Sequence, residues 1–332
     1  MSSTNEHPFI AGTPLQNSPA KTAGPPCPVC HNPQCEVILQ SVTGYPIVRC
    51  SECALVYTDD RTAPPPSSLY PAFDQTEDSP YLNHVRSAVS VFLRQRAAVV
   101  RSMKPGGRLL DYGCGNGAFA KHMSETGFSA VGLEPFSLGS PQVRGNLRLV
   151  RGPLEEATDL GEFDAITLWH VLEHVPNPVD LLTRLAKHLR PDGVLFVSVP
   201  NFASWQSSVF RDSWFHLDAP RHLLHFEPDT LTDCLKRAGL SSVKEHRFLP
   251  EYGGSGWVQS ALNKVLPHSN YLYEVVKDRG ALKSLSVTSS LVHLVTSMVA
   301  GAPLFALSLP IEAAASMGNR GAALTVAARR QL

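Results

Sequence analysis

The chain has 332 residues, and its 29 lysines and arginines balance its 29 aspartates and glutamates. This balance excludes an overall field that attracts nucleic acid, so we expect no nucleic-acid partner. Residues 1–26 are rich in Ser, Thr, Pro and Asn and lack the pattern of a signal peptide, which predicts a disordered lead. Together with seven cysteines and no secretory signal, this favours a cytoplasmic protein.

The first ordered element expected is a small metal-binding module. Its four cysteines form two Cys-x-x-Cys pairs: Cys27, Cys30, Cys50 and Cys53. Four thiolates at this spacing are typical of a closed tetrahedral zinc site, although four unconnected thiols remain the alternative. We therefore predict a zinc ribbon over residues 27–57, with structural Zn²⁺ supplying folding energy. Residues 58–80 are rich in Pro, Ser and Asp and are expected to form a linker.

Beyond the linker, residues 81–332 alternate between helical and strand patterns. Apolar positions from Val85 to Val100 follow the spacing of one helix face. Strands are expected at residues 109–112, 130–133, 147–150, 165–168, 194–199, 243–248 and 322–328. Helices between them, notably at 116–127, 179–189 and 228–238, indicate the α/β class. The order predicts a Rossmann-like, doubly wound, mostly parallel seven-stranded sheet.

A glycine-rich loop follows the first of these strands. Asp111 ends the strand, and Gly113, Gly115 and Gly117 lead into the next helix. Glycine allows a ligand to lie against bare backbone near the positive end of a helix. Glu134 ends the second strand, where an acid can accept hydrogen bonds from ribose hydroxyls. A dinucleotide would also fit, but neither Gly-x-Gly-x-x-Gly nor a phosphate-binding Gly-Lys-Ser/Thr is present here.

Together with residues 132–134, 163–176 and 189–196, this loop resembles the class I S-adenosylmethionine-dependent methyltransferases, including the ubiquinone-biosynthesis and sugar-nucleotide types. The resemblance covers residues 84–250 and the last strand, and it implies S-adenosylmethionine as cofactor. It places Asp111 at the cofactor's amino-acid portion, Gly113, Gly115 and Gly117 along its backbone path, Glu134 at the ribose, Leu154 or Glu155 at the adenine, and Trp169 and His170 at the methionine end. The structural alternatives are a turn cap for Asp111 and a core position for Trp169.

The run from His170 to His174, His-Val-Leu-Glu-His, also matches an inverted zinc-peptidase motif. That motif requires a helix, and Pro176 and Pro178 end any helix here, so we do not expect a peptidase. Some methyltransferases of the ubiquinone type carry Glu-x-x-Glu-His at this place and bind a divalent metal. Because His170 occupies the first position, a metal at His170, Glu173 and His174 stays open, and packing with a hydrogen-bonded His174 is favoured.

Residues 214–226 are rich in histidine and aromatic side chains. Methyl transfer to a hydroxyl or an activated carbon needs a general base. The segment resembles the acceptor side of the family, and in sugar-nucleotide C-methyltransferases, which also carry an N-terminal zinc-binding region, a histidine in a similar run is the base. We predict His222 as the base and His225 as the second choice; capping of the next helix is the alternative. The expected acceptor is a small-molecule, sugar or lipid-like compound, methylated at oxygen or carbon.

An insertion of about 250–317 separates the last two strands. Residues 284–311 carry no Asp, Glu, Lys or Arg, a length that could cross a bilayer. The last strand must return to the sheet, which argues against a single crossing, so we predict a hydrophobic helical insertion with peripheral contact on the inner face of the membrane. Internal packing or contact with a second subunit are the alternatives. The rival to an enzyme, a zinc-ribbon adaptor or nucleic-acid scaffold, is disfavoured because the ribbon lacks a basic stripe.

Overall fold

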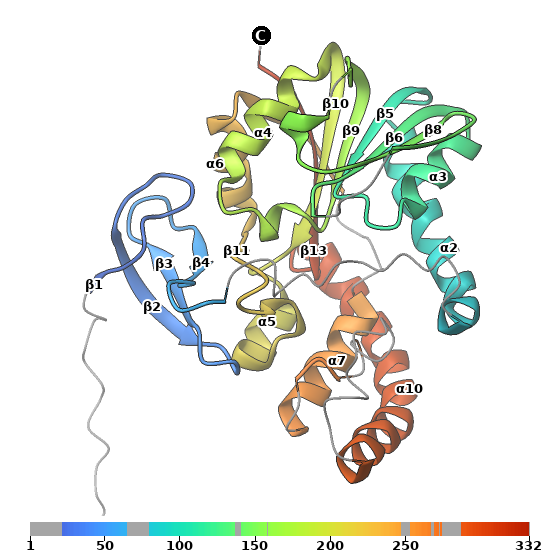
Figure 1. Ribbon diagram of the computed structural model, residues 1–332. Helices are drawn as coiled ribbons and strands as arrows, with labels where there is room; N and C mark the ends of the chain where they lie inside the picture. Colours follow the sequence, from blue (N-terminus) through green and yellow to red (C-terminus); the bar gives the residue numbers. More distant parts are fainter. Residues whose placement is uncertain are drawn as a thin grey trace, which may run out of the picture.

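The computed structural model describes residues 22–64, 80–136, 141–157, 159–246, 253–266, 269–271, 273 and 287–331. Figure 1 shows three parts: a large sheet with helices on both faces, a small sheet beside it, and a pair of helices extending from its lower edge. Most of the disordered lead and of the linker predicted from the sequence lies outside the described residues.

The large sheet has the strand order β12-β13-β10-β9-β5-β6-β8-β7. Its strands are β5 (Gly107–Tyr112), β6 (Phe128–Glu134), β7 (Gln142–Arg144), β8 (Leu147–Arg151), β9 (Phe163–Trp169), β10 (Leu189–Pro200), β12 (Leu240–His246) and β13 (Ala323–Arg330). The five strands from β8 to β10 are parallel, and β13 runs antiparallel to both of its neighbours. This confirms the Rossmann-like sheet; β7 adds an eighth, antiparallel strand at the edge.

Each face of this sheet is covered because its central strands are apolar at successive positions. Side chains alternate between faces along a strand, so Leu109 packs toward one face and Leu110 toward the other. The Leu109 face is covered by α2 (Pro80–Arg101) and α3 (Ala118–Glu125), and the Leu110 face by α4 (Pro178–Lys187) and α6 (Pro228–Arg237). A parallel sheet buried on both faces brings the ends of β5, β6 and β9 to one edge, where the predicted site lies.

The small sheet consists of β1 (Thr22–Ala23), β2 (Gln34–Gln40), β3 (Pro46–Cys50), β4 (Val56–Thr58) and β11 (Leu224–His225). The strands β2 and β3 form a hairpin within the predicted ribbon. The ribbon extends further than predicted at both ends, because β1 pairs with β2 and Thr58 closes β4. Its last strand, β11, comes from the segment between β10 and α6, and Leu224 is in register with Tyr57. The ribbon is therefore joined to the large domain by strand pairing.

The insertion between β12 and β13 contains α7 (Gly253–Val265) and α10 (Val287–Met317), which pack against each other. A Cβ at Gly253 would lie 2.5 Å from Cγ of Glu312, and one at Gly254 would lie 2.6 Å from Cε2 of Phe305. The absent side chains thus allow close approach of the two helices, which run antiparallel. The hydrophobic helical insertion predicted from the sequence is present.

Candidate active site

The glycine loop between β5 and α3 holds open space beside bare backbone. Gly113, Gly115 and Gly117 have φ values of 72°, 56° and 79°, in the left-handed region that favours glycine. A Cβ at Gly113 would lie 2.5 Å from Val171, and one at Gly117 would lie 2.7 Å from Leu149. At Gly115 a Cβ would meet nothing within 4 Å. The outer two glycines therefore serve packing, and Gly115 leaves room for a ligand.

Glu134 connects the end of β6 to this loop. Its Oε2 accepts a hydrogen bond of 2.7 Å from the Gly115 N–H, and its Oε1 accepts one of 3.2 Å from the Phe136 N–H. Arg151 Nη1 donates to the Gly115 carbonyl at 3.2 Å. An ionised carboxylate accepts up to about four hydrogen bonds. Glu134 therefore keeps the capacity to accept ribose hydroxyls while it fixes the loop.

Asp111 lies at the end of β5 and is 3% exposed. Burial raises the pKa of its carboxyl to about 7. Two neighbours act in the opposite direction and lower this pKa: the Thr167 hydroxyl, which donates a hydrogen bond of 2.7 Å to Oδ1, and the positive charge of Arg96. A ligand ammonium group would favour the ionised form. This electrostatic environment suits the cofactor's amino-acid portion, the role that the sequence resemblance implies for Asp111.

The residues predicted beside the adenine lie just after β8, and those predicted at the methionine end lie at the end of β9. Leu154 is buried in η1 (Leu154–Glu156), whereas the Glu155 side chain forms an ion pair with Arg184 of α4. An adenine contact would thus use the backbone here more readily than the Glu155 carboxylate. Trp169 ends β9, with its ring centroid 5.5 Å from that of Phe119. The cofactor roles of these residues stay predictions.

His170 directly follows Trp169, just beyond the end of β9. Its backbone has a φ of 56°, and its N–H donates to the Ser198 carbonyl at 2.9 Å. Its Nδ1 lies 3.3 Å from a carboxylate oxygen of the fully buried Glu173. The motif from 170 to 174 forms only the three-residue turn η2 (Leu172–His174), so the peptidase geometry of two histidines on one helix face is absent from it.

Glu173 and His174 are instead joined by His222. One possible ligand atom from each of the three lies within 4.8 Å of the others. The Nδ1 of His174 donates to the Arg221 carbonyl at 2.9 Å, and the Nδ1 of His222 donates to the His216 carbonyl at 2.7 Å. Because both carbonyls require an N–H at Nδ1, the Nε2 of each neutral ring carries a lone pair.

These three groups can act as proton acceptors or as metal ligands. Burial lowers the pKa of His222, and it lowers the pKa of His174 to about 4, so both rings are neutral near pH 7. Burial raises the pKa of Glu173, whereas electrostatic interaction with His174 and His222 lowers it. Two imidazole nitrogens and one carboxylate oxygen also form a donor set that suits zinc and other first-row divalent metals.

His225, the second predicted base, has a different environment. Its Nε2 lies 3.1 Å from the Thr58 hydroxyl, and burial lowers its pKa to about 3. The Thr58 hydroxyl donates to the His222 carbonyl at 2.7 Å. Sequence reasoning missed Thr58, and it missed the approach of Glu173 to His222. No local pattern signals either contact, because the partners are far apart in the chain.

The four cysteines of the predicted zinc site lie close together. Cys27 Sγ lies 3.5 Å from Cys53 Sγ, Cys30 Sγ lies 3.5 Å from Cys50 Sγ, and all four sulfurs are within 4.8 Å of one another. Zinc–sulfur bonds of about 2.3 Å in a tetrahedron place the sulfurs about 3.8 Å apart. The donor set and its spacing fit structural zinc.

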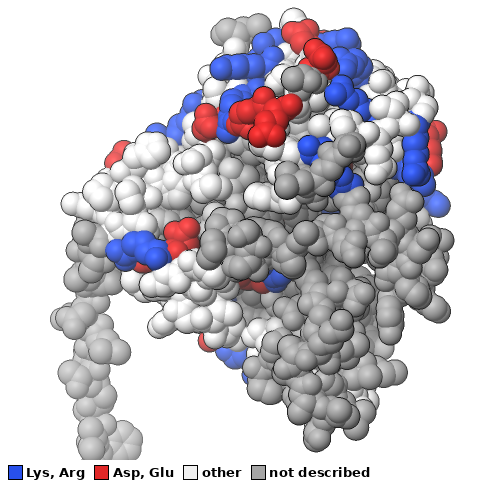
Figure 2. All heavy atoms as spheres, in the orientation of Figure 1, with Lys and Arg blue, Asp and Glu red and all other residues white. Residues whose placement is uncertain are grey.

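Over the described ribbon residues 22–64, the basic side chains are Arg49 and Arg61. On the face drawn in Figure 2, Lys and Arg alternate with Asp and Glu, and the pair at the ribbon includes both signs. Arg49 of β3 is itself paired with Glu227 at 2.9 Å. Such a face lacks the stripe that phosphate binding requires.

Comparison with known proteins decides the family. The model of the methyltransferase domain family matches residues 81–245, from α2 to β12. This chain belongs to the S-adenosylmethionine-dependent methyltransferases. The methyltransferase is 29% identical over 203 residues to a ubiquinone biosynthesis O-methyltransferase of Xanthomonas oryzae pv. oryzae, covering 57% of this chain and 76% of the relative. With the enzyme of the same description from Vibrio parahaemolyticus, it shares 27% identity over 170 residues, covering 48% of this chain and 70% of the relative.

Among solved structures, the methyltransferase matches an S-adenosylmethionine-dependent methyltransferase from Mesorhizobium loti. The match has 17% sequence identity and a TM-score of 0.40, and it covers 70% of this chain and 96% of that chain.

Proposed function

We propose that this methyltransferase transfers a methyl group to a hydroxyl oxygen of a small-molecule acceptor, with His222 as general base. The observation that carries the proposal is the 2.7 Å hydrogen bond from His222 Nδ1 to the His216 carbonyl, which leaves Nε2 as the proton acceptor. Oxygen is favoured over carbon because the relatives are O-methyltransferases. Sugar and lipid-like acceptors remain within the proposal.

The roles of the side chains follow from their charges. Asp111 binds the ammonium group, Glu134 the ribose hydroxyls and the Leu154 backbone the adenine, while Trp169 and His170 border the methionine end. S-adenosylmethionine supplies the methyl group, whose bond to sulfur breaks as its bond to the acceptor oxygen forms. His222 Nε2 takes the hydroxyl proton, and the Glu173 carboxylate stabilises the resulting imidazolium. Holding the reactants in line contributes much of the rate gain.

The test compares His222→Asn with His188→Asn. The asparagine at 222 retains an N–H that can reach the His216 carbonyl but has no basic nitrogen. His188 offers a matched control, since its Nδ1 also bonds a carbonyl, that of Gly161 at 3.0 Å, at the start of β10. With a catechol probe and labelled S-adenosylmethionine, His222→Asn should lower kcat by about 10²- to 10⁴-fold, and His188→Asn should leave it unchanged. Equal rates in both variants would exclude His222 as the base.

Binding of a divalent cation is the alternative function of Glu173, His174 and His222, because one ligand atom from each lies within 4.8 Å of the others. We infer that Cys27, Cys30, Cys50 and Cys53 hold a structural zinc and that Glu173, His174 and His222 hold no metal. Elemental analysis of the purified protein should give one zinc per chain and none in Cys50→Ser. A second equivalent of metal, lost in Glu173→Gln, would assign His222 to ligation instead of proton transfer.

We also propose that this cytoplasmic methyltransferase contacts the inner face of a membrane through α10. The segment Val295–Met317 is apolar enough to span a bilayer, and only 18% of its most apolar window is buried. Exposed side chains lie along much of its length: Val292, Val295, Val299, Phe305, Leu307, Leu309, Ile311 and Met317. The last strand pairs with both β12 and β10, which supports contact along the membrane surface and not a crossing.

A lipid surface is favoured over a second copy of the chain by the charges that flank the helix in the sequence. Lys277, Arg279 and Lys283 precede it with only Asp278 among them, and no acidic residue occurs from 284 to 311. Basic residues beside an apolar helix are attracted to anionic lipid headgroups. An apolar contact between two copies would gain nothing from these charges. The proposal therefore specifies an anionic bilayer.

Flotation with phosphatidylcholine vesicles containing anionic phosphatidylglycerol tests this contact. Val299→Glu should reduce binding strongly, because Val299 is 72% exposed on α10. Val143→Glu is the matched control: Val143 is 69% exposed, but it lies on β7 at the far edge of the sheet. A dimer in detergent-free buffer that Val299→Glu dissociates, with no vesicle binding by the wild type, would assign the surface to self-association.

A further inference from the structure

The segment that carries His222 lies between the ribbon and the turn after β9. Leu223 makes the connection in both directions: its N–H donates to the Glu173 carbonyl at 2.8 Å, and its carbonyl accepts from the Thr58 N–H at 2.9 Å. The next two residues form β11, which pairs with β4. The backbone at His222 therefore depends on a strand that begins some 165 residues earlier in the sequence.

The Thr58 side chain adds a contact to His222 itself. Its hydroxyl has one proton, which it donates to the His222 carbonyl at 2.7 Å. The same oxygen therefore accepts from His225 Nε2, which lies 3.1 Å away. Thr58 is 3% exposed and His225 is also 3% exposed, so water does not replace these bonds readily. His225 thereby fixes the direction of the Thr58 hydroxyl.

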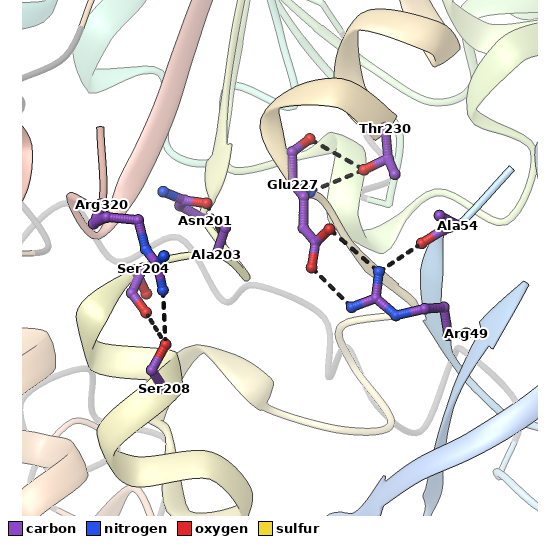
Figure 3. A network of polar contacts seen from close by, with 9 residues as sticks. All are labelled: Arg49, Ala54, Asn201, Ala203, Ser204, Ser208, Glu227, Thr230 and Arg320. Carbon is purple, nitrogen blue, oxygen red and sulfur yellow. Dashed lines mark hydrogen bonds and ion pairs between the residues drawn. The ribbon is translucent and has the colours of Figure 1, made fainter. Parts of the chain in front are cut away.

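Two further contacts attach the ribbon on either side of this point. Thr43 Oγ1 donates to the Ala219 carbonyl at 2.8 Å. Arg49 donates through both terminal nitrogens to the Glu227 carboxylate at 2.9 and 3.2 Å, as Figure 3 shows at the start of α6. The ribbon thus contacts residues 219–227 before, at and after His222. This arrangement restrains the segment more firmly than one contact would.

We propose that Thr58, oriented by His225, is a positioning residue for His222, so that strand β4 of the ribbon forms part of the acceptor site. The inference rests on the proposed role of His222 as base. It gives His225 a function in the site without proton transfer. It also gives the ribbon a catalytic purpose, because a displacement of about 1 Å at a reacting group can cost on the order of 10² in rate.

The experiment compares three variants of the full chain. Thr58→Val removes the hydroxyl at nearly constant volume, and Thr58→Ser restores it. Thr232→Val is the control, because Thr232 also donates to a carbonyl, that of Pro228 at 2.9 Å, but on α6. With the catechol probe, Thr58→Val should lower kcat by about tenfold or more, Thr58→Ser should recover most of it, and the dissociation constant of S-adenosylmethionine should stay within about twofold.

A spectroscopic readout separates positioning from general loss of structure and needs no acceptor. Long-range ¹H–¹⁵N correlation on histidine-labelled protein reports the tautomer of His222, whose signals are those missing from His222→Asn. Wild type and Thr232→Val should show a single tautomer with the proton on Nδ1. Thr58→Val should show a mixture, because the ring no longer keeps its place opposite the His216 carbonyl. A pure Nδ1–H tautomer in Thr58→Val with unchanged kcat would overturn the proposal.

The double variant distinguishes failure of this inference from failure of the proposed function. If Thr58 acts through His222, adding Thr58→Val to His222→Asn should change kcat by less than about twofold. Full additivity of the two losses would assign Thr58 a separate structural role and overturn the inference while leaving His222 as the base. If His222→Asn retains wild-type kcat, the base assignment fails first, and the tautomer measurement still decides whether Thr58 orients the ring.

Discussion

The two halves of the proposed site are built differently. The donor half is centred on one continuous stretch, since Asp111, Gly115 and Glu134 all belong to β5, the glycine loop and β6. The acceptor half is assembled from Thr58 of the ribbon, Glu173 after β9 and His222 before β11. The donor half therefore depends on local backbone geometry, whereas the acceptor half depends on the docking of a separate module. Substitutions should be able to disable one half and leave the other intact.

The largest effect is expected at the donor half. Gly115→Arg fills the space beside the loop and should weaken S-adenosylmethionine binding from micromolar to millimolar, about 10³-fold or 4 kcal/mol. Gly145→Arg provides a close control, because its φ of 58° matches the 56° of Gly115 and its Cβ also meets nothing within 4 Å. Calorimetry on both variants measures the difference. Equal weakening would attribute the effect to backbone strain and not to an occupied cofactor site.

The second largest effect is expected from Cys50→Ser, which should disable the acceptor half and leave cofactor binding intact. Cys50→Ser removes one of the four zinc ligands, and the ribbon should lose the folding energy that the metal supplies. Hydrogen exchange should then accelerate at the amides of β4 and β11, and kcat should fall by about 10². The dissociation constant of S-adenosylmethionine should stay within about twofold. Slow exchange at β11 in Cys50→Ser would show that strand pairing holds without the metal.

The donor half could be predicted from the sequence to a greater extent than the acceptor half. The strand order, the glycine loop and Glu134 follow from short-range patterns, because each depends on residues within one strand–helix unit. The pairing of β4 with β11 has no such signal, since Val56 to Thr58 and Leu224 to His225 are too short to specify a partner. For the same reason, the sequence assigned Thr58 to a linker, whereas the structure places it against His222.

A third, intermediate effect concerns pH at the donor half. The ionised form of Asp111 attracts the ammonium group, and its pKa of about 7 means that the ionised fraction falls as pH falls below 7. The cofactor's amino group, an α-amino group with a reference pKa near 7.7–8.0, stays protonated over that range. S-adenosylmethionine should therefore bind about tenfold more weakly at pH 5.5 than at pH 7. In Asp111→Asn the affinity should be low and nearly independent of pH; a similar slope in the variant would assign the titration to another group.

The smallest effect is expected where the two modules meet. The bidentate pair of Arg49 and Glu227 is partly exposed, with side chains 29% and 26% accessible, so its contribution to stability is discounted for solvent. Arg49→Lys keeps the charge but loses the paired geometry, and it should cost about 0.5–1 kcal/mol of unfolding free energy. Arg190→Lys, at the Asp164 pair near the start of β10, should cost a similar amount. Only Arg49→Lys should also lower kcat, because only that pair borders the segment that carries His222. Denaturant unfolding and turnover measured on both variants would show whether the ribbon affects catalysis through docking or through stability alone.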